Sequence, residues 1–528
     1  MKKFASILLA AVLVLALCIP AFAYDINITS DVTGHTYEAY QIFSGTYAEV
    51  NGNATLGDID WGTGINGDAF LAALKADTTF DTTFDACTTA AEVAAIMTGA
   101  NWGNDSANAK LFAKLAGDNL TAVKATSTAT TGGYNITNLT DGYYLVQDVN
   151  VPEGTDSYTS YILQVIKDQT VTPKVGLPTV TKKVEENTKY NQDGGFGTGF
   201  NDVADYNIND VVDFKLIGTL PANYADYDTY SYTFHDTQSA GLTFDDTSVV
   251  VTAGGTILDA ADYAVTVNPD DGHTFDIVID NLKDIAGLTA ASQIVVTYSS
   301  TLNKDAVIGL DGNPNEVYLE FSNNPNGEGT GTTETDKVIV FTYELDVTKV
   351  DGAGTAITTG AHFRLYKTVE GVKNYAIVDA DDSKITGWTT VETDASDLVS
   401  DNDGTFAVIG LDDGDYFLEE TQAPAGYNVL TAPIAFSIGA TTVNDQDWNA
   451  AEDAGDALTA LSIDVGGTVT NGNLEDGTVD MDVVNNTGST LPSTGGIGTT
   501  IFYVVGTMLM LGAAILMITK KRMAATAA

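Results

Sequence analysis

The sequence predicts a mainly β protein built from three tandem antiparallel β-sandwich domains, the first with a short helical insertion. Apolar and polar residues alternate over short runs, such as the one that contains Val317, Leu319 and Phe321, and this period of two is typical of half-buried strands. The 51 glycines, with many Asn and Asp residues, supply turns between these runs. A body of roughly 470 residues exceeds the usual range of about 100–200 residues per domain, which favours three domains.

One part of the chain departs from this alternation. Two groups of apolar residues there recur at the i, i+1, i+4 spacing of a helical face: Phe70, Leu71 and Leu74, then Leu111, Phe112 and Leu115. We expect these side chains to pack the core of a helical insertion in the first domain rather than to form a ligand site.

Residues 1–23 have the organisation of a secretory signal peptide. Two lysines precede an apolar core, Ile7–Ile19, and an A-x-A cleavage site ends at Ala23. The exported chain then starts at Tyr24 with Cys87 as its single cysteine, so no internal disulfide is expected to stabilise it. Cys87 is expected to be an ordinary buried thiol.

Three features follow one another near the C-terminal end. The motif Leu491-Pro492-Ser493-Thr494-Gly495 precedes an apolar stretch, Ile497–Ile518, and the basic cluster Lys520-Lys521-Arg522 comes after it. An apolar run of about 20 residues can cross a bilayer, and the basic cluster stays on the cytoplasmic side. The order resembles the cell-wall sorting signal of Gram-positive sortase substrates, which implies that a sortase cysteine attacks the Thr494 carbonyl and releases Gly495 onward. An ordinary membrane anchor is the alternative.

Two extended segments mark the joints between domains, Thr172–Pro178 and the Asn-, Gly- and Thr-rich segment Asn323–Asp336. Together with the two ends they give the expected organisation: a signal peptide at 1–23, an N-terminal domain at 24–175, a middle β-sandwich at 176–341, a C-terminal β-sandwich at 342–490, and the sorting signal, transmembrane segment and basic tail at 491–528.

The charge of the chain excludes one class of partner. It has 23 basic and 71 acidic residues, and five of the basic ones lie in the two terminal segments, which leaves 18 against 71, or −53, for the exported body. Nucleic-acid binding requires clustered Lys and Arg, so nucleic acid is not expected as a partner.

Three strands of the third domain place one polar side chain each among apolar side chains on the same face: Lys349 with Leu345 and Val347, Glu420 with Tyr416 and Leu418, Asn485 with Met481 and Val483. Burial opposes charge, so it lowers the pKa of a lysine and raises that of a carboxyl group. A neutral amine beside a protonated acid and a carboxamide can exchange an amide: the amine attacks the amide carbonyl, the acid polarises it, and ammonia leaves. A buried Lys–Glu ion pair with Asn as a neighbour is the alternative.

The same segments resemble a known family. Glu344–Gly352 and Tyr416–Tyr427 are similar to the CnaB-type, immunoglobulin-like domains of Gram-positive backbone pilins, the second segment to their so-called E-box. In that family Lys and Asn are joined by an intramolecular isopeptide bond with the acid as catalyst. The resemblance implies a bond between Lys349 and Asn485 with Glu420 as the acid, which would tie the first strand of the domain to the last.

The second domain repeats this pattern. Lys182 lies among apolar residues of its strand face, as does Asn323, and Tyr232–Phe244 resembles the segment in which family members place an aspartate. The resemblance therefore implies a bond between Lys182 and Asn323 with Asp236 as the acid.

Other residues are not expected to form isopeptide bonds, because of their position on the strands. Lys183 and Asn324 have the opposite parity and are expected to face solvent. In the first domain Gln147 occupies the position of the acid, and the first strand, Ile26–Ser30, has no lysine. No isopeptide bond is expected in the first domain.

Polymerisation requires a further nucleophile, which the family supplies in a Tyr-Pro-Lys pilin motif. The counterpart here is Val171-Thr172-Pro173-Lys174, with Thr172 in place of Tyr. The resemblance implies the major shaft subunit of a covalent pilus on the cell wall, in which sortase joins Thr494 of one subunit to Lys174 of the next. The implied partners are identical pilin subunits, pilus and housekeeping sortases and peptidoglycan, with minor tip or base pilins and a host-surface ligand left open.

Two other classes of function fit the sequence less well. A single-copy wall-anchored adhesin would bind host matrix through the helical first domain and would have no use for Lys174. A wall-anchored hydrolase has little support, because the four histidines form neither H-x-x-x-H nor a recognisable triad. No cofactor and no metal are expected. Calcium at the acidic turns 379–383 and 401–404 is left open as an alternative, although neither turn has the terminal Glu of a calcium loop.

Overall fold

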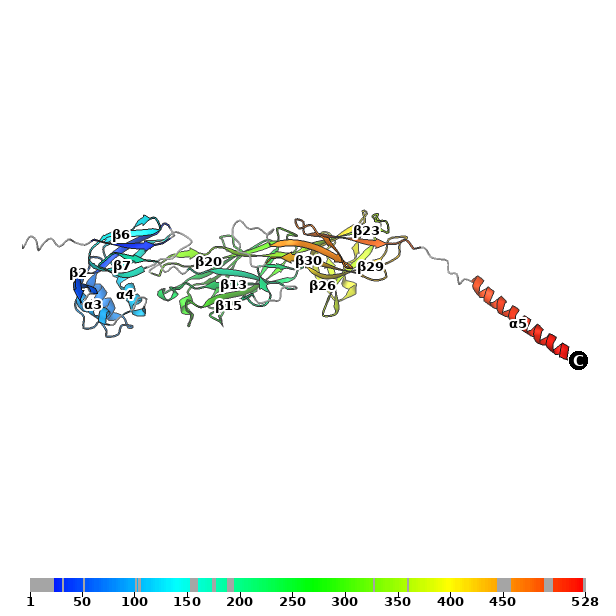
Figure 1. Ribbon diagram of the computed structural model, residues 1–528, viewed down its shortest axis with the longest axis horizontal. Coiled ribbons are helices and arrows are strands. Elements are labelled where there is room, and N and C mark those ends of the chain that lie inside the picture. Colours follow the sequence, from blue (N-terminus) through cyan, green and yellow to red (C-terminus); the bar gives the residue numbers. More distant parts are fainter. Residues whose placement is uncertain are drawn as a thin grey trace, which may run out of the picture. The chain divides into compact units, whose positions relative to one another are not determined.

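The computed structural model describes residues 23–30, 33–50, 53–99, 102, 106–151, 160–172, 177–187, 194–325, 328–358, 360–443, 457–488 and 497–525. These residues are mainly β-strand, which confirms the predicted fold class (Figure 1). The chain divides into two compact units, one formed mainly by residues up to Thr342 and the other mainly by residues from Tyr343.

The N-terminal part of the first unit has two sheets, ordered β5-β6-β1-β9 and β3-β2-β7-β8, with β4 beside β2. Strand β1 runs antiparallel to β6 and parallel to β9. The strands are β1 (Tyr24–Thr29), β2 (Thr36–Val50), β3 (Asn53–Trp61), β4 (Ala125–Thr126), β5 (Thr128–Thr130), β6 (Gly133–Leu139), β7 (Gly142–Asn150), β8 (Ser160–Val165) and β9 (Gln169–Val171).

The predicted helical insertion is present in this part. Its helices are α2 (Gly67–Ala76), α3 (Ala90–Gly99) and α4 (Ala107–Gly117). The side chains of Asn66 and Ser106 cap the first and third of these helices by accepting a backbone N–H bond. All six apolar residues of the predicted helical faces belong to one core or pack against it, and Cys87 is buried in the same core. The expectation of a packing role is confirmed.

The second part of the first unit is a sandwich of two larger sheets, ordered β11-β10-β13-β19-β15-β16 and β12-β22-β20-β14-β18-β17, with β21 beside β20. One continuous aromatic and aliphatic core is formed from residues of both sheets. The elements are β10 (Val180–Glu185), β11 (Phe200–Asn201), β12 (Val203–Asp205), β13 (Val211–Thr219), η1 (Tyr224–Asp226), β14 (Tyr232–Gln238), β15 (Leu242–Ala253), β16 (Thr256–Ile257), β17 (Ala264–Val267), β18 (Phe275–Ile279), η2 (Leu282–Asp284), β19 (Gln293–Leu302), β20 (Asn313–Ser322), β21 (Thr330–Thr332) and β22 (Asp336–Phe341).

The second unit has a small sheet, β28-β23-β33, and a larger one, β26-β25-β24-β29-β30-β31-β32, with β27 beside β24. Its first and last strands, β23 and β33, are parallel neighbours. The elements are β23 (Tyr343–Asp351), β24 (His362–Val369), β25 (Val372–Val378), β26 (Ile385–Thr389), η3 (Glu392–Asp394), β27 (Leu398–Val399), β28 (Thr405–Leu411), β29 (Gly414–Gln422), β30 (Ile434–Thr442), β31 (Leu458–Val465), β32 (Thr468–Asn471) and β33 (Thr478–Asn485).

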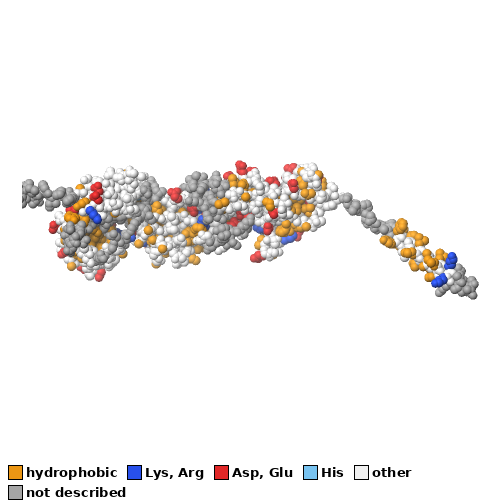
Figure 2. Space-filling model, viewed as in Figure 1, with side chains coloured by type: hydrophobic (Ala, Val, Ile, Leu, Met, Phe, Trp, Pro, Cys, Tyr) orange, Lys and Arg blue, Asp and Glu red, His pale blue; other side chains and the backbone are white. Residues whose placement is uncertain are grey.

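The last described element is helix α5 (Ile497–Ala525). Its segment Ile501–Lys521 has 21 residues and is, among the described helices, the one long and apolar enough to cross a membrane. Figure 2 shows hydrophobic side chains along this helix and basic side chains near its end. The order expected for a span followed by a basic tail is therefore present.

The predicted boundary between 341 and 342 lies next to the joint between the two units. The boundary between 175 and 176 falls in segment 173–176, outside the described residues. We keep the division of the first unit into two domains as a proposal, which rests on the separate sheets formed before and after this segment.

Candidate functional site

The second sandwich places a lysine and an aspartate against each other in its core. Lys182 lies on β10 and Asp236 on β14, one strand from each of the two sheets. Their side chains are fully buried, and the Lys182 Nζ donates to Asp236 Oδ2 at 2.5 Å and to the Glu316 carbonyl at 3.2 Å. The alternation of β10 and β14 therefore directs both polar groups into the core, as the strand pattern predicted.

A tyrosine and an asparagine complete this cluster. The Tyr298 hydroxyl donates to Asp236 Oδ2 at 2.9 Å, and Asn315 Nδ2 donates to the Tyr298 hydroxyl at 2.8 Å. Asn315 is 0% exposed. The polar chain Lys182–Asp236–Tyr298–Asn315 thus connects an amine, an acid and a carboxamide inside an otherwise apolar core.

The predicted partner, Asn323, is not part of this cluster. Strands β14 and β20 pair with Asp236 opposite Val317, and Asn323 lies six residues further along the chain, or about 20 Å if extended. The strand register therefore favours Asn315 over the predicted Asn323 as the partner of Lys182, because Asn315 is connected to Asp236 through the Tyr298 hydroxyl.

Burial shifts both ionisable groups of the second sandwich toward their neutral forms. Desolvation lowers the pKa of Lys182, and the nearby Asp236 opposes this effect. Desolvation likewise raises the pKa of Asp236, against the attraction of Lys182 and the Tyr298 hydrogen bond. Desolvation is the largest cause of the pKa shift in both cases, since burial penalises the charged form of each group.

The C-terminal sandwich brings together all three residues that the sequence predicted. Asn485 Nδ2 donates to Glu420 Oε2 at 3.0 Å, and the Lys349 Nζ donates to the Val483 carbonyl at 2.6 Å. The parallel pairing of β23 with β33 sets Lys349 opposite Val483, two residues before Asn485 on the same strand face. Lys349 and Asn485 are both 0% exposed.

The electrostatics of this second site follow the same rule. Desolvation lowers the pKa of Lys349 from 10.5 to about 8, and the charge of Glu420 partly offsets that effect. A backbone N–H from Leu430 holds the same Glu420 oxygen at 2.8 Å. The acid is thereby fixed, and the amine loses its proton more easily than an ordinary lysine.

One feature is shared by both sites. In the part of the chain that the structure describes, four buried oxygens have no hydrogen-bond partner at these sites: Asp236 Oδ1, Asn315 Oδ1, Glu420 Oε1 and Asn485 Oδ1. Each site therefore contains one orphan carboxyl oxygen and one orphan amide carbonyl oxygen. A proton on the carboxyl oxygen would turn this pair of acceptors into a donor and an acceptor.

Lys183 does not face solvent, and that expectation was wrong. Its side chain is buried, pairs with Asp202 and lies over the Phe196 ring at 4.5 Å. Strand β10 is therefore covered on both faces, which a simple alternation cannot show. Asn324 is half-buried rather than fully exposed.

The first domain has a different buried pair. The buried acid on β7 is Asp148, the residue after Gln147. Its Oδ2 atom lies 2.7 Å from His35 Nδ1. Register shifts between β2 and β7 at Thr36/Tyr37 and Gln41/Phe43 change which residues face the core. The sequence did not identify this histidine and aspartate as a pair.

The residues predicted to link subunits lie outside the described part of the chain. These are Lys174 and the whole motif Leu491, Pro492, Ser493, Thr494 and Gly495. The flanking elements are described: β9 ends at Val171 on one side of Lys174, and Leu177 packs against the core of the second sandwich on the other.

Comparison with known proteins identifies the class. Residues 208–325 match the family model of the Gram-positive pilin backbone subunit 2, Cna-B-like domain; residues 343–451 match a prealbumin-like fold domain; and residues 483–524 match the LPXTG cell wall anchor motif. These matches confirm the predicted resemblance. The chain is a backbone pilin of the Gram-positive type, a shaft subunit of a surface pilus that is anchored to the cell wall.

Individual relatives agree with this class. The trypsin-resistant surface T6 protein of Streptococcus pyogenes serotype M6 is 26% identical over 443 residues, which cover 71% of this chain and 73% of the relative. The solved T6 backbone pilin of serotype M6 matches with 19% identity and a TM-score of 0.50, covering 88% of this chain and 99% of that one. The major pilin SpaD from Corynebacterium diphtheriae has 16% identity, a TM-score of 0.46, and coverages of 88% and 97%. The T6 backbone pilin, like the pilin backbone family whose model matches, is a structural subunit.

Proposed function

We propose that this pilin forms two intramolecular isopeptide bonds without help from another protein, Lys182 to Asn315 and Lys349 to Asn485. In each reaction the neutral lysine Nζ attacks the Asn Cγ, a new Nζ–Cγ bond forms, the Cγ–Nδ2 bond breaks, and the amide nitrogen leaves as ammonia. Asp236 and Glu420 donate a hydrogen bond to the amide oxygen during attack, transfer a proton to the leaving nitrogen and accept the proton that Nζ loses, so that each acid ends the reaction as it began. The chain modifies itself once and turns over no substrate.

The pair of orphan oxygens at each site is the observation that carries this proposal. If the acid were ionised, its second carboxylate oxygen and the amide oxygen of the Asn would both be buried acceptors without a donor. Burying unpaired acceptors costs free energy. A protonated acid removes this cost and polarises the amide carbonyl. The lowered lysine pKa and the raised Asp236 pKa act in the same direction.

We further propose that a sortase joins the Thr494 carbonyl of one subunit to Lys174 of the next, and that the basal subunit is transferred to peptidoglycan. Two other lysines near this joint are poor acceptors. Lys182 and Lys183 are buried and paired with aspartates, whereas Lys167 is exposed and is the remaining neighbour in sequence. Pilus and housekeeping sortases are the enzymes proposed for the two transfers.

The test of subunit linkage is an immunoblot of cell-wall extracts. The wild type should give a ladder of multimers that resist SDS, and Lys174→Ala should reduce it to a monomer band that is still attached to the wall through Thr494. Lys167→Ala is the matched control, because it removes an exposed lysine close by in the sequence and should leave the ladder intact.

Two results would contradict the proposal in different ways. Loss of the ladder in the Lys167 variant but not in the Lys174 variant would transfer the acceptor role to Lys167. A single band in the wild type would instead favour the monomeric adhesin, in which neither lysine is linked.

A further inference from the structure

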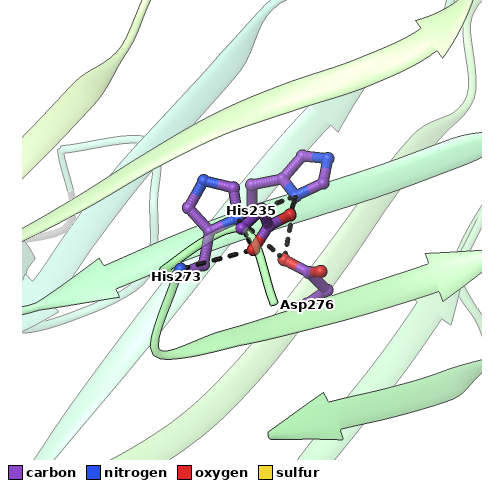
Figure 3. Close-up of side chains that lie close together, drawn as sticks. His235, His273 and Asp276 are labelled. Carbon is purple, nitrogen blue, oxygen red and sulfur yellow. Dashed lines mark hydrogen bonds and ion pairs between the residues drawn. The ribbon is translucent and has the colours of Figure 1, made fainter. Parts of the chain in front are cut away.

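Two histidines and two aspartates meet on the outer face of the second sandwich (Figure 3). His235 lies on β14, Asp276 on β18, and Asp271 and His273 on the loop that leads into β18. One donor atom from each of the four side chains can be chosen so that all four lie within 4.8 Å of one another. His235 directly precedes Asp236, so the alternation of β14 directs it away from the core that holds the proposed isopeptide site.

The distances between these donor atoms fit a bound metal ion. The Nδ1 atoms of His235 and His273 are 3.2 Å apart. Asp276 Oδ1 lies 2.8 Å from His235 Nδ1 and 3.3 Å from His273 Nδ1. Asp271 Oδ1 lies 3.0 Å from His273 Nδ1. A tetrahedral ion with ligands at about 2.0–2.1 Å separates its ligand atoms by about 3.3 Å, which is close to these edges.

Two features orient the imidazole rings for this role. Strands β20, β14 and β18 pair so that Tyr318, His235 and Asp276 form a row across three neighbouring strands. The Tyr318 ring stacks on His235 with centroids 4.7 Å apart, and the Tyr318 hydroxyl is 3.3 Å from His273 Nε2. A hydrogen-bond partner on the second ring nitrogen is typical of metal-bound histidine, and when Nε2–H of His273 donates to the Tyr318 oxygen, Nδ1 is free to bind an ion.

The loop itself is also fixed to the strands. Thr274 N donates to the Asp236 carbonyl at 2.8 Å, and Asn268 N donates to the Thr274 carbonyl at 2.9 Å. The side chains of His235, His273 and Asp276 are 10–15% exposed, whereas that of Asp271 is 47% exposed. Three ligands are therefore held in place, and the fourth lies where an ion can enter from solvent.

We propose that this cluster binds one divalent transition-metal ion, with Zn²⁺ as the best match. Two neutral imidazoles and two carboxylates carry a charge of −2, which a divalent ion neutralises. Imidazole nitrogen and carboxylate oxygen in a four-coordinate arrangement suit Zn²⁺, whereas Ca²⁺ takes six to eight oxygen ligands. The ion would tie the loop before β18 to β14 and stabilise the folded domain in proportion to its occupancy.

The test is calorimetric titration of the detergent-solubilised full-length chain with ZnCl₂ after removal of metals with EDTA. We expect one site per chain and an increased Tm at saturation. Co²⁺ in place of Zn²⁺ should give the intense visible bands of a tetrahedral ion. His273→Ala should weaken binding by at least about 100-fold, since even the loss of a residue that only orients a ligand costs about 10–100-fold.

Asp271→Asn serves as a second variant: the side chain is half exposed, so the substitution should leave the fold intact while weakening Zn²⁺ binding. His362→Ala is the matched control: it removes another histidine whose Nδ1 lies 2.7 Å from an aspartate, Asp397, but which lies outside the cluster. It should bind Zn²⁺ as the wild type does. The proposal is overturned if the wild type binds no Zn²⁺, or if it binds with an affinity that neither variant changes, as scattered surface carboxylates would.

Discussion

A comparison of two asparagine variants, one at Asn315 on strand β20 and one at Asn323 just beyond its end, gives the sharpest test of the internal bonds. Asn315 and Asn323 are both buried, and they lie eight positions apart. Asn315→Ala removes the carboxamide that the structure places in the cluster around Lys182, whereas Asn323→Ala removes the one that strand parity alone had selected. Intact-mass measurement of the exported chain, residues 24–490, should show the loss of two ammonia molecules in the wild type and in Asn323→Ala, but of one in Asn315→Ala.

The cost in stability can be estimated from the chain that the bond closes. A link from Lys182 to Asn315 closes a loop of about 130 residues, and the chain-entropy treatment of a cross-link of that length gives about 5 kcal/mol. Loss of the hydrogen bonds of a buried carboxamide costs about 1–3 kcal/mol in either variant. Asn315→Ala should therefore lose several kcal/mol more than Asn323→Ala when unfolding is followed in urea.

The mass measurement can refute this reasoning independently of stability. Two lost ammonia molecules in Asn315→Ala, with one in Asn323→Ala, would show that the strand register is not the one that forms during folding. No loss in the wild type would show that both polar clusters are unreacted ion pairs or hydrogen-bonded networks.

Three further outcomes are expected. Glu420→Ala should retain one more ammonia than the wild type and be cut faster by trypsin; an unchanged mass would exclude this acid from the reaction. In Asn485→Ala the unreacted Lys349 should keep its lowered pKa of about 8 against 10.5 when unfolded, so the folded state binds fewer protons between these values. Stability should rise by about 3 kcal/mol from pH 8 to 10.5, and a flat profile would contradict a buried amine. Thr494→Ala should leave both internal bonds intact but strand the protein at the membrane, which fractionation of wall and membrane would detect.

Several properties followed from the sequence because they depend on local order alone. The sorting signal is defined by a motif, an apolar span and a basic tail in succession, and helix α5 contains the span followed by the basic residues. The buried faces of the strands follow from a period of two, so Lys182, Lys349 and Glu420 could be placed in cores from their neighbours. In the third domain the three predicted residues lie in one buried cluster because its first and last strands are direct neighbours.

Position along a strand was decided by the tertiary structure. Asn315 and Asn323 share a face and are equivalent by parity, and only the pairing of β14 with β20, which sets Asp236 opposite Val317, selects one of them. Similarly, Lys183 is buried because Asp202 and Phe196 cover the second face of β10. The alternation of residues along a strand predicts the face on which a side chain lies. The partners of that side chain depend on strand register and on contacts between segments far apart in the chain. The same is true of His235 and His273, 38 residues apart in sequence, whose nitrogens meet because β14 pairs with β18.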